Sequence, residues 1–294
     1  MSEATLAIQR IKKKKRSPLR EGLHRLLHNR LAMFGALLVI LEIGLALFAS
    51  VITPYEPNKM DYTVLLTAPS AEHLLGTDEL GRDIFTRMMY GARLSLAVGT
   101  MAVVLAVILG VPFGLIAGYV GGYVDELLMR VVDSVMALPA LVLALTISAV
   151  LGSGLINATI AIAVVTAPTY TRLVRGQVLS IKQNDYVEAA HSIGAPVWLI
   201  LMRHILPNAF SPIIVQASLG IGFAIILESS MSFIGLGAQL PTASWGNMVR
   251  VGFQFLELAP WFALAPATAI FLAVLGFNML GDGLRDALDP QSTA

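Results

Sequence analysis

Residues 185–208 read DYVEAAHSIGAPVWLILMRHILPN, a moderately polar stretch between long apolar runs. Residues 185–193 contain no helix breaker and predict a short helix. Gly194 can adopt the left-handed conformation that ends a helix, and Pro196 can begin the next one. Pro207 is expected to end this second helix. The stretch therefore predicts two short helices around a break, presented to a partner.

One face of the second predicted helix is apolar. Its residues recur at helical spacing: Val197, Ile200, Leu201 and His204. Two basic residues, Arg203 and Lys182, lie beside this stripe. Such a stripe suits a groove or an interface. Whether the partner is a membrane or a protein depends on the rest of the chain.

The composition identifies a membrane protein. Of the 294 residues, 56% are hydrophobic and only 13% are charged, whereas a soluble domain carries roughly a quarter charged residues. There is no cysteine, which excludes disulfides, thiol catalysis and thiolate metal sites. The basic N-terminus and the long apolar segment behind it predict an uncleaved anchor rather than a signal peptide.

Six apolar segments are long enough to cross a bilayer. They cover residues 31–52, 94–119, 131–151, 155 to about 170, 209 to about 236, and 259–280. Internal prolines, such as Pro139, predict kinks that a membrane helix tolerates. Gly110, Gly114 and Gly118 are spaced to let two helix backbones approach closely. The predicted fold class is an all-α polytopic membrane protein with six transmembrane helices.

Charge sets the expected orientation. Nine basic residues precede the first span: Arg10, Lys12, Lys13, Lys14, Lys15, Arg16, Arg20, Arg25 and Arg30. Basic residues accumulate on the cytoplasmic side, so six spans predict cytoplasmic N- and C-termini. The same count places residues 185–208 in the cytoplasm, where the partner would be a protein.

The expected organisation divides the chain into five parts. These are a basic cytoplasmic segment with an amphipathic surface helix (1–30), the first transmembrane helix (31–52), a periplasmic loop (53–92), a core of five helices that contains the 185–208 loop (93–282), and a cytoplasmic tail (283–294).

No catalytic pattern is present. The sequence contains no GxxxxGK[ST], HExxH or GxSxG motif, and its five histidines are scattered. The chain is therefore expected to be no enzyme, to bind no metal or cofactor, and to need another chain for any work driven by ATP. Nothing in it points to nucleic acid.

Three ionisable residues lie inside the predicted spans, where each is costly unless it faces a partner or water. Glu228, which Ser229 follows, is a candidate for a transport pathway, and a helix-packing role is the open alternative. Asp133 is expected to pair with Arg130 one turn earlier. Glu42 is expected to be structural.

The central stretch resembles a known signature. Its Glu188, Ala189, Ala190, Gly194, Leu206 and Pro207 resemble the EAA motif of membrane subunits of bacterial ABC importers. His204 stands where isoleucine is usual, a variant typical of the peptide and nickel importer branch. In this family the motif lies in a cytoplasmic loop that docks into the ATPase.

Three further segments resemble the dipeptide, oligopeptide and nickel permeases. They are HLLGTDELGRDIFTRMMYGARLSL (73–96), SFIGLGAQLPTASWG (232–246) and NMLGDGLRDALDP (278–290). In the first, Gly76 to Asp78 predict a turn and N-cap for a helix through Arg87. In the second, Leu240 and Ala243 stand where the family has prolines. Together the matches cover nearly the whole chain.

The resemblance implies the second-permease (C-type) subunit of a type I ABC importer in the bacterial inner membrane. Its implied partners are a homologous permease subunit, two cytoplasmic ATPases that bind ATP and magnesium, an external substrate-binding protein and membrane lipid. The implied ATPase-coupling residues are Glu188, Ala189, Ala190, Gly194, Val197, Leu201, Leu206 and Pro207.

The substrate stays open between peptides, glutathione, opine-like conjugates and nickel complexes, with di- or oligopeptides as the default. Two other functions also remain open. One is a secondary transporter or channel driven by an ion gradient, with Glu228 as the coupling site. The other is a membrane scaffold that transports nothing.

Overall fold

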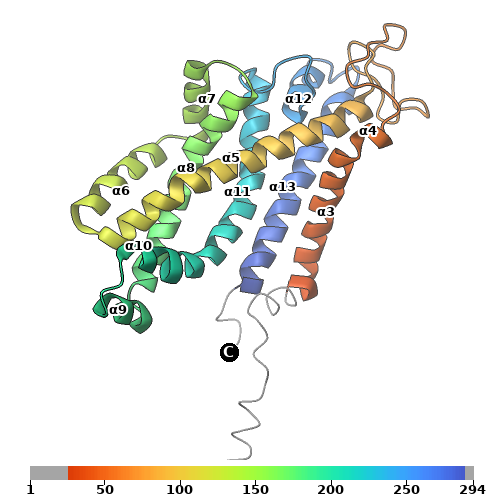
Figure 1. The fold of residues 1–294 in the computed structure, drawn as a ribbon. Coiled ribbons are helices and arrows are strands. Elements are labelled where there is room, and N and C mark those ends of the chain that lie inside the picture. The colour runs from red at the N-terminus through yellow and green to blue at the C-terminus, as the bar shows by residue number, and fades with distance from the viewer. Residues whose placement is uncertain (1–25, 289–294) are drawn as a thin grey trace, which may run out of the picture.

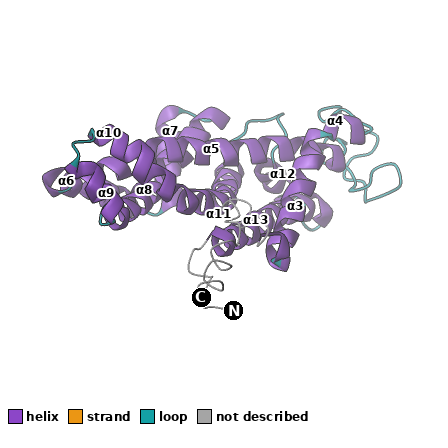
Figure 2. Ribbon diagram, turned by 60° about the horizontal axis from the view of Figure 1, so that its bottom comes forward, coloured by secondary structure: helices purple, strands orange, loops and turns teal. Residues whose placement is uncertain are grey.

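The computed structural model describes residues 26–288 and shows a bundle of helices, without a β-strand among these residues (Figure 1). The elements are α3 (Arg30–Leu47), α4 (Ala49–Ile52), α5 (Ile84–Val120), α6 (Gly122–Met136), α7 (Ala140–Leu151), α8 (Leu155–Ile181), α9 (Asp185–Ser192), α10 (Val197–Ile200), a π-helical turn (Leu201–Ile205), α11 (Leu206–Ile234), α12 (Trp245–Phe253) and α13 (Pro260–Leu288). Figure 2 shows the same helices from a second direction. The helical class is confirmed, while most of the predicted N-terminal surface helix and the end of the tail lie outside the described residues.

Four helices are long and apolar enough to cross a membrane: α3, α5, the continuous run Val197–Ile234, and α13. A fifth span results if α6 and α7 count as one helix broken by a bend of 92°. This bend is the kink expected at Pro139, which disfavours helical conformation at the residue before it. The 27 residues of α8 are enough to cross a membrane, but this helix is more polar than the four spans. The described residues thus give four or five apolar spans.

The two ends of the bundle differ (Figure 1). The start of α3 and the end of α13 lie at the same end of the bundle as α9. The irregular segment between α4 and α5 lies at the opposite end, near α12. The arrangement therefore separates the 185–208 stretch from the 53–83 segment by the length of the spanning helices.

Helices α5 and α8 pack closely because one part of α5 has glycines four residues apart. A Cβ atom on Gly110 or Gly114 would lie 2.5 or 2.6 Å from the carbonyl oxygens of Ala167 or Thr171. No side chain fits in such a space, so the backbones are in contact, as the glycine spacing predicts.

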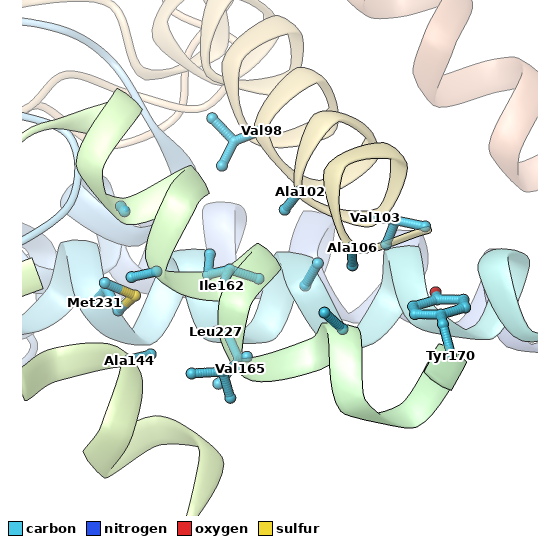
Figure 3. Packing of buried hydrophobic residues seen from close by; sticks show 14 residues of the cluster. Val98, Ala102, Val103, Ala106, Ala144, Ile162, Val165, Tyr170, Leu227 and Met231 are labelled. Atoms are coloured by element: carbon cyan, nitrogen blue, oxygen red, sulfur yellow. The ribbon is translucent and has the colours of Figure 1, made fainter. Parts of the chain in front are cut away.

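The main core is built from small side chains. Figure 3 shows Val98, Ala102, Val103 and Ala106 of α5 facing Ile162 and Val165 of α8, with Leu227 and Met231 of α11 close by. Close contact between small residues lets dispersion forces hold helices together where lipid supplies no hydrophobic drive.

The segment before α5 is held by buried charges. Asp78 is fully buried, and its carboxylate accepts a 2.6 Å hydrogen bond from Arg82 Nε and lies 3.4 Å from Arg87 Nε. Burial raises the pKa of the neighbouring Glu79 carboxyl, and the Asp78 charge adds to this rise. A buried ion cluster of this kind fixes the segment onto the end of α5.

The helix that follows this segment begins later than the sequence suggests. The N-cap predicted at Gly76 to Asp78 is wrong, because Asp83 caps α5 by accepting a 2.7 Å hydrogen bond from the Thr86 N–H. Asp78 instead uses its side chain to bind Arg82. Helix α5 runs from Ile84 to Val120, so the helix predicted through Arg87 and the span predicted from residue 94 form one continuous helix.

Candidate functional site

The 185–208 stretch begins as the sequence predicts. Helix α9 ends before Gly194, which has a φ of +79°. The Gly194 N–H donates to His191 O at 3.0 Å, and the Ala195 N–H donates to Ala190 O at 3.1 Å. A left-handed glycine that closes a helix in this way is expected, since L-residues with a Cβ pay a steric cost there.

The second half of the 185–208 stretch differs from the prediction. Helix α10 passes through the π-helical turn directly into α11, so Pro207 does not end a helix but lies in the first turn of α11. The Leu206 N–H donates to Leu201 O, five residues earlier. Proline is accepted in a first turn because no N–H is needed there. The predicted short second helix is therefore the start of a long one.

The loop is fastened to the bundle by an apolar cluster. Val187 and Ala190 of α9, together with Ile200 and Ile205, are buried and pack against Val174, Val178 and Ile181 of α8. The buried pair Ile200 and Ile205 is five residues apart because the π-turn is wider than an α-turn. Of the predicted stripe Val197, Ile200, Leu201 and His204, only Ile200 is buried.

The opposite face of the loop exposes apolar side chains. Ile193 is 84% exposed and Trp198 is 66% exposed. Val197 is also exposed and lies between them in sequence. Local periodicity does not predict that Ile193 and Trp198 are exposed, because it does not tell an exposed apolar residue from a buried one. Exposed apolar residues gathered in this way are typical of an interaction surface.

The predicted coupling residues are divided between the two faces. Glu188, Ala189, Gly194, Val197 and Pro207 are exposed, Leu201 and Leu206 are half-buried, and Ala190 is buried. The stretch therefore has one side packed on the bundle and one side exposed.

His204, the departure from the usual motif, connects the two halves of the loop. Its ring lies 6.2 Å from the ring of Tyr186, centroid to centroid. Asn208 donates hydrogen bonds to the Tyr186 hydroxyl at 3.3 Å and to His204 O at 2.6 Å. These contacts join α9 to the π-turn.

Ion pairs join α6 to α8 at the same end of the molecule. Arg175 donates two hydrogen bonds to Asp125, at 2.5 and 2.6 Å, and Arg172 donates one to Asp133 at 2.6 Å. The predicted pairing of Asp133 with Arg130 is wrong, since Arg130 lies 3.8 Å from Glu126. The two arginines are bound by another helix rather than free for a ligand.

Glu228 lies between helices rather than in a cavity. It is fully buried, and it accepts hydrogen bonds from Ser95 of α5 at 3.1 Å and from Ser232 at 2.7 Å. Ser95 and Ser232 also accept hydrogen bonds from the backbone N–H groups of Trp245 and Ala238. The carboxylate thus joins α5, α11 and the segment leading to α12.

Ser229, the next residue of α11, lines a cavity of about 450 Å³ with Ser230, Phe233 and Gly246. Within residues 26–288, no three histidine or carboxylate side chains come together in a group that could hold a metal ion.

Two family models match the chain. Residues 110–293 match the binding-protein-dependent transport system inner membrane component, and residues 17–69 match the N-terminal transmembrane domain of oligopeptide transport permease C. The first model covers more than half of the chain, including the whole 185–208 stretch.

Curated relatives are similar over nearly their full length. The dipeptide transport system permease protein DppC of Alkalihalophilus pseudofirmus is 48% identical over 94% of this chain and 90% of its own. The glutathione transport system permease protein GsiD of Pectobacterium atrosepticum is 46% identical over 98% and 96%. The GsiD of Shigella flexneri is 50% identical over 94% and 91%.

The apolar helices define a polytopic membrane protein, and both matching family models are transport components. The chain belongs to the family of binding-protein-dependent transport system inner membrane components. It is the permease subunit of an ABC importer, a multi-pass protein of the inner membrane, as the resemblance in its sequence predicts.

Proposed function

We propose that the chain is the second permease of a di- or oligopeptide importer, and that it forms half of the translocation pathway. The named substrates of its relatives, dipeptides and glutathione, are small molecules with peptide bonds. In this proposal a homologous permease supplies the other half of the pathway. An external binding protein delivers the substrate, and two cytoplasmic ATPases bind ATP and magnesium.

The observation that carries this proposal is the two-sided 185–208 loop. Its buried side, with Ile200 and Ile205, is continuous with α8 and α11, so a push on the loop is transmitted to helices that cross the membrane. On its exposed side lie Ile193 and Trp198. In this proposal they fit into a groove of the ATPase. A rigid element fastened on one side and apolar on the other can act as a lever between two conformations.

The 185–208 loop can act as this lever only if it faces the cytoplasm, which is the orientation expected from the distribution of basic residues. We propose that α8 is the remaining span, giving six, and that the α9 end of the bundle and both termini face the cytoplasm. Arg172, Arg175 and Lys182 support this orientation, because they lie at the α9 end of α8. The 53–83 segment then faces the binding protein.

The proposed function is tested by reconstitution. The complete transporter, with both permeases and both ATPases, is placed in liposomes and supplied with dialanine and the binding protein. ATP-dependent uptake is expected, and vanadate is expected to stop it. Uptake driven by a proton gradient without ATP would instead support the ion-coupled alternative.

Replacing Trp198 by alanine is expected to weaken ATPase binding. A mostly exposed tryptophan at an interface contributes about 2 kcal/mol or more, so binding is expected to fall by about thirtyfold. Co-purification of the ATPases with the permease measures this, and the permease content of membranes is expected to stay the same. The matched control is Tyr62→Ala, an equally exposed aromatic in the 53–83 segment. Equal recovery of the ATPases with both variants would contradict the proposal that the exposed side of the 185–208 loop binds the ATPase.

A further inference from the structure

A second cavity lies where the chain bends. It has a volume of about 420 Å³, is bordered by the α6–α7 bend, α8 and α11, and is open on one side. Its lining includes Met136, Leu138, Thr169, Tyr170, Gln216 and Phe223, and contains no charged side chain. Small-molecule sites have volumes of about 300 to 1,000 Å³ and combine apolar walls with a few polar groups.

Two polar side chains in this cavity are unused. The Gln216 carboxamide and the Thr169 hydroxyl form no hydrogen bond with any described residue, whereas the Thr166 hydroxyl is bound to Ile162 O at 2.7 Å. A carboxamide has both donors and acceptors. It therefore matches a peptide bond, which offers one N–H and one C=O.

The cavity wall depends on a glycine. The Tyr170 hydroxyl donates to Gln216 O at 3.4 Å and lies directly against Gly220. A Cβ at position 220 would collide with the tyrosine hydroxyl. Gly220 thus allows the ring to pack across α11 beside the Gln216 side chain.

Both cavities border α11. Some of the residues of this helix that line them recur at intervals of three or four and form a stripe that winds around it: Gln216, Gly220, Phe223, Ile226, Ser229 and Phe233. At a rise of about 1.5 Å per residue, this stripe is roughly 25 Å long, close to the hydrocarbon thickness of a bilayer. Gln216 lies toward the loop end of the stripe, and Ser229 lies toward the opposite end.

We propose that this stripe of α11 lines the subunit's half of the pathway, and that Gln216 and Thr169 bind the substrate through its peptide bond. This inference rests on the proposed function. Because the Gln216 cavity has no charged side chain, its contacts are to the neutral amide group that all peptides share and not to their charged termini. Selection between side chains then falls to other parts of the transporter.

The natural absence of cysteine makes the site directly testable. In the reconstituted transporter, Phe223→Cys keeps Gln216 and gives this chain a single thiol in the cavity, whose reaction with a water-soluble methanethiosulfonate is followed by the mass of the chain. Dialanine with its binding protein and ATP is expected to slow labelling at least fivefold. The control Gln254→Cys, at the exposed end of α12, is expected to react equally with and without the peptide.

A second pair of variants checks the chemistry. Gln216→Leu is expected to lower dialanine uptake per ATP hydrolysed about tenfold, as the loss of hydrogen bonds to one amide predicts. Gln254→Leu is expected to leave it unchanged. ATP-driven uptake with a thiol at position 223 that is unreactive, or that dialanine does not protect, would overturn the inference alone. Absence of ATP-driven uptake by the natural protein would overturn the proposed function.

Discussion

Substrate uptake is expected to fall at least tenfold when Gly194 is replaced by valine, while the protein still inserts into the membrane. Gly194 has a φ of +79°, and a Cβ there would meet no atom within 4 Å. The cost is therefore purely conformational, about 1 to 2 kcal/mol for an L-residue and more for a β-branched one. It acts at the turn that, under the proposed function, orients α9 against the ATPase.

The open space around Gly194 allows a sharp control. Asparagine tolerates the left-handed conformation better than other residues with a Cβ, so Gly194→Asn is expected to keep most of the uptake. Gly176→Val places the same side chain at an exposed glycine of α8, also without a neighbour within 4 Å, and is expected to have little effect. ATPase activity that responds normally to the loaded binding protein in Gly194→Val would disprove the lever.

Replacing Glu228 by leucine is expected to lower the thermal stability of the purified transporter strongly. The change removes two hydrogen bonds and leaves the buried hydroxyls of Ser95 and Ser232 without their acceptor. Each unsatisfied buried group costs about 1 to 3 kcal/mol, so a loss of about 3 kcal/mol or more is expected. The midpoint of thermal unfolding, measured in detergent, reports this loss.

Further variants distinguish a role of Glu228 in helix packing from a role in ion-coupled transport. Glu257→Leu makes the identical change at an exposed position and is expected to alter the midpoint little. Glu228→Gln keeps the shape and one acceptor, and is expected to retain ATP-driven uptake. Full thermal stability of Glu228→Leu together with complete loss of uptake would show that Glu228 serves transport directly.

Much of the fold follows from local sequence patterns. Long apolar runs predict the membrane class and the helices, and Gly110 and Gly114 predict the close contact between α5 and α8. Gly194 predicts the break in the loop. Each of these depends on a property that a residue carries wherever it is placed, such as a missing side chain or an apolar surface.

Pairings between distant segments could not be predicted in this way. Asp133 binds Arg172, 39 positions away, rather than Arg130 one turn earlier. Glu228 binds Ser95, 133 positions away. Many partners are within reach of an acidic side chain in a bundle, and only the packing of the helices selects among them.

The sequence alone determined that the chain is a helical membrane protein, and it predicted residues 185–208 as the partner-binding loop. The tertiary structure decided which side of that loop is free, because the π-turn places Ile200 and Ile205 inward and leaves Trp198 outward. It also decided which residues of α11 line the cavities. In a membrane helix, residues facing lipid and residues facing the core are both apolar, so hydrophobic pattern does not separate them. Only contact with the other helices does.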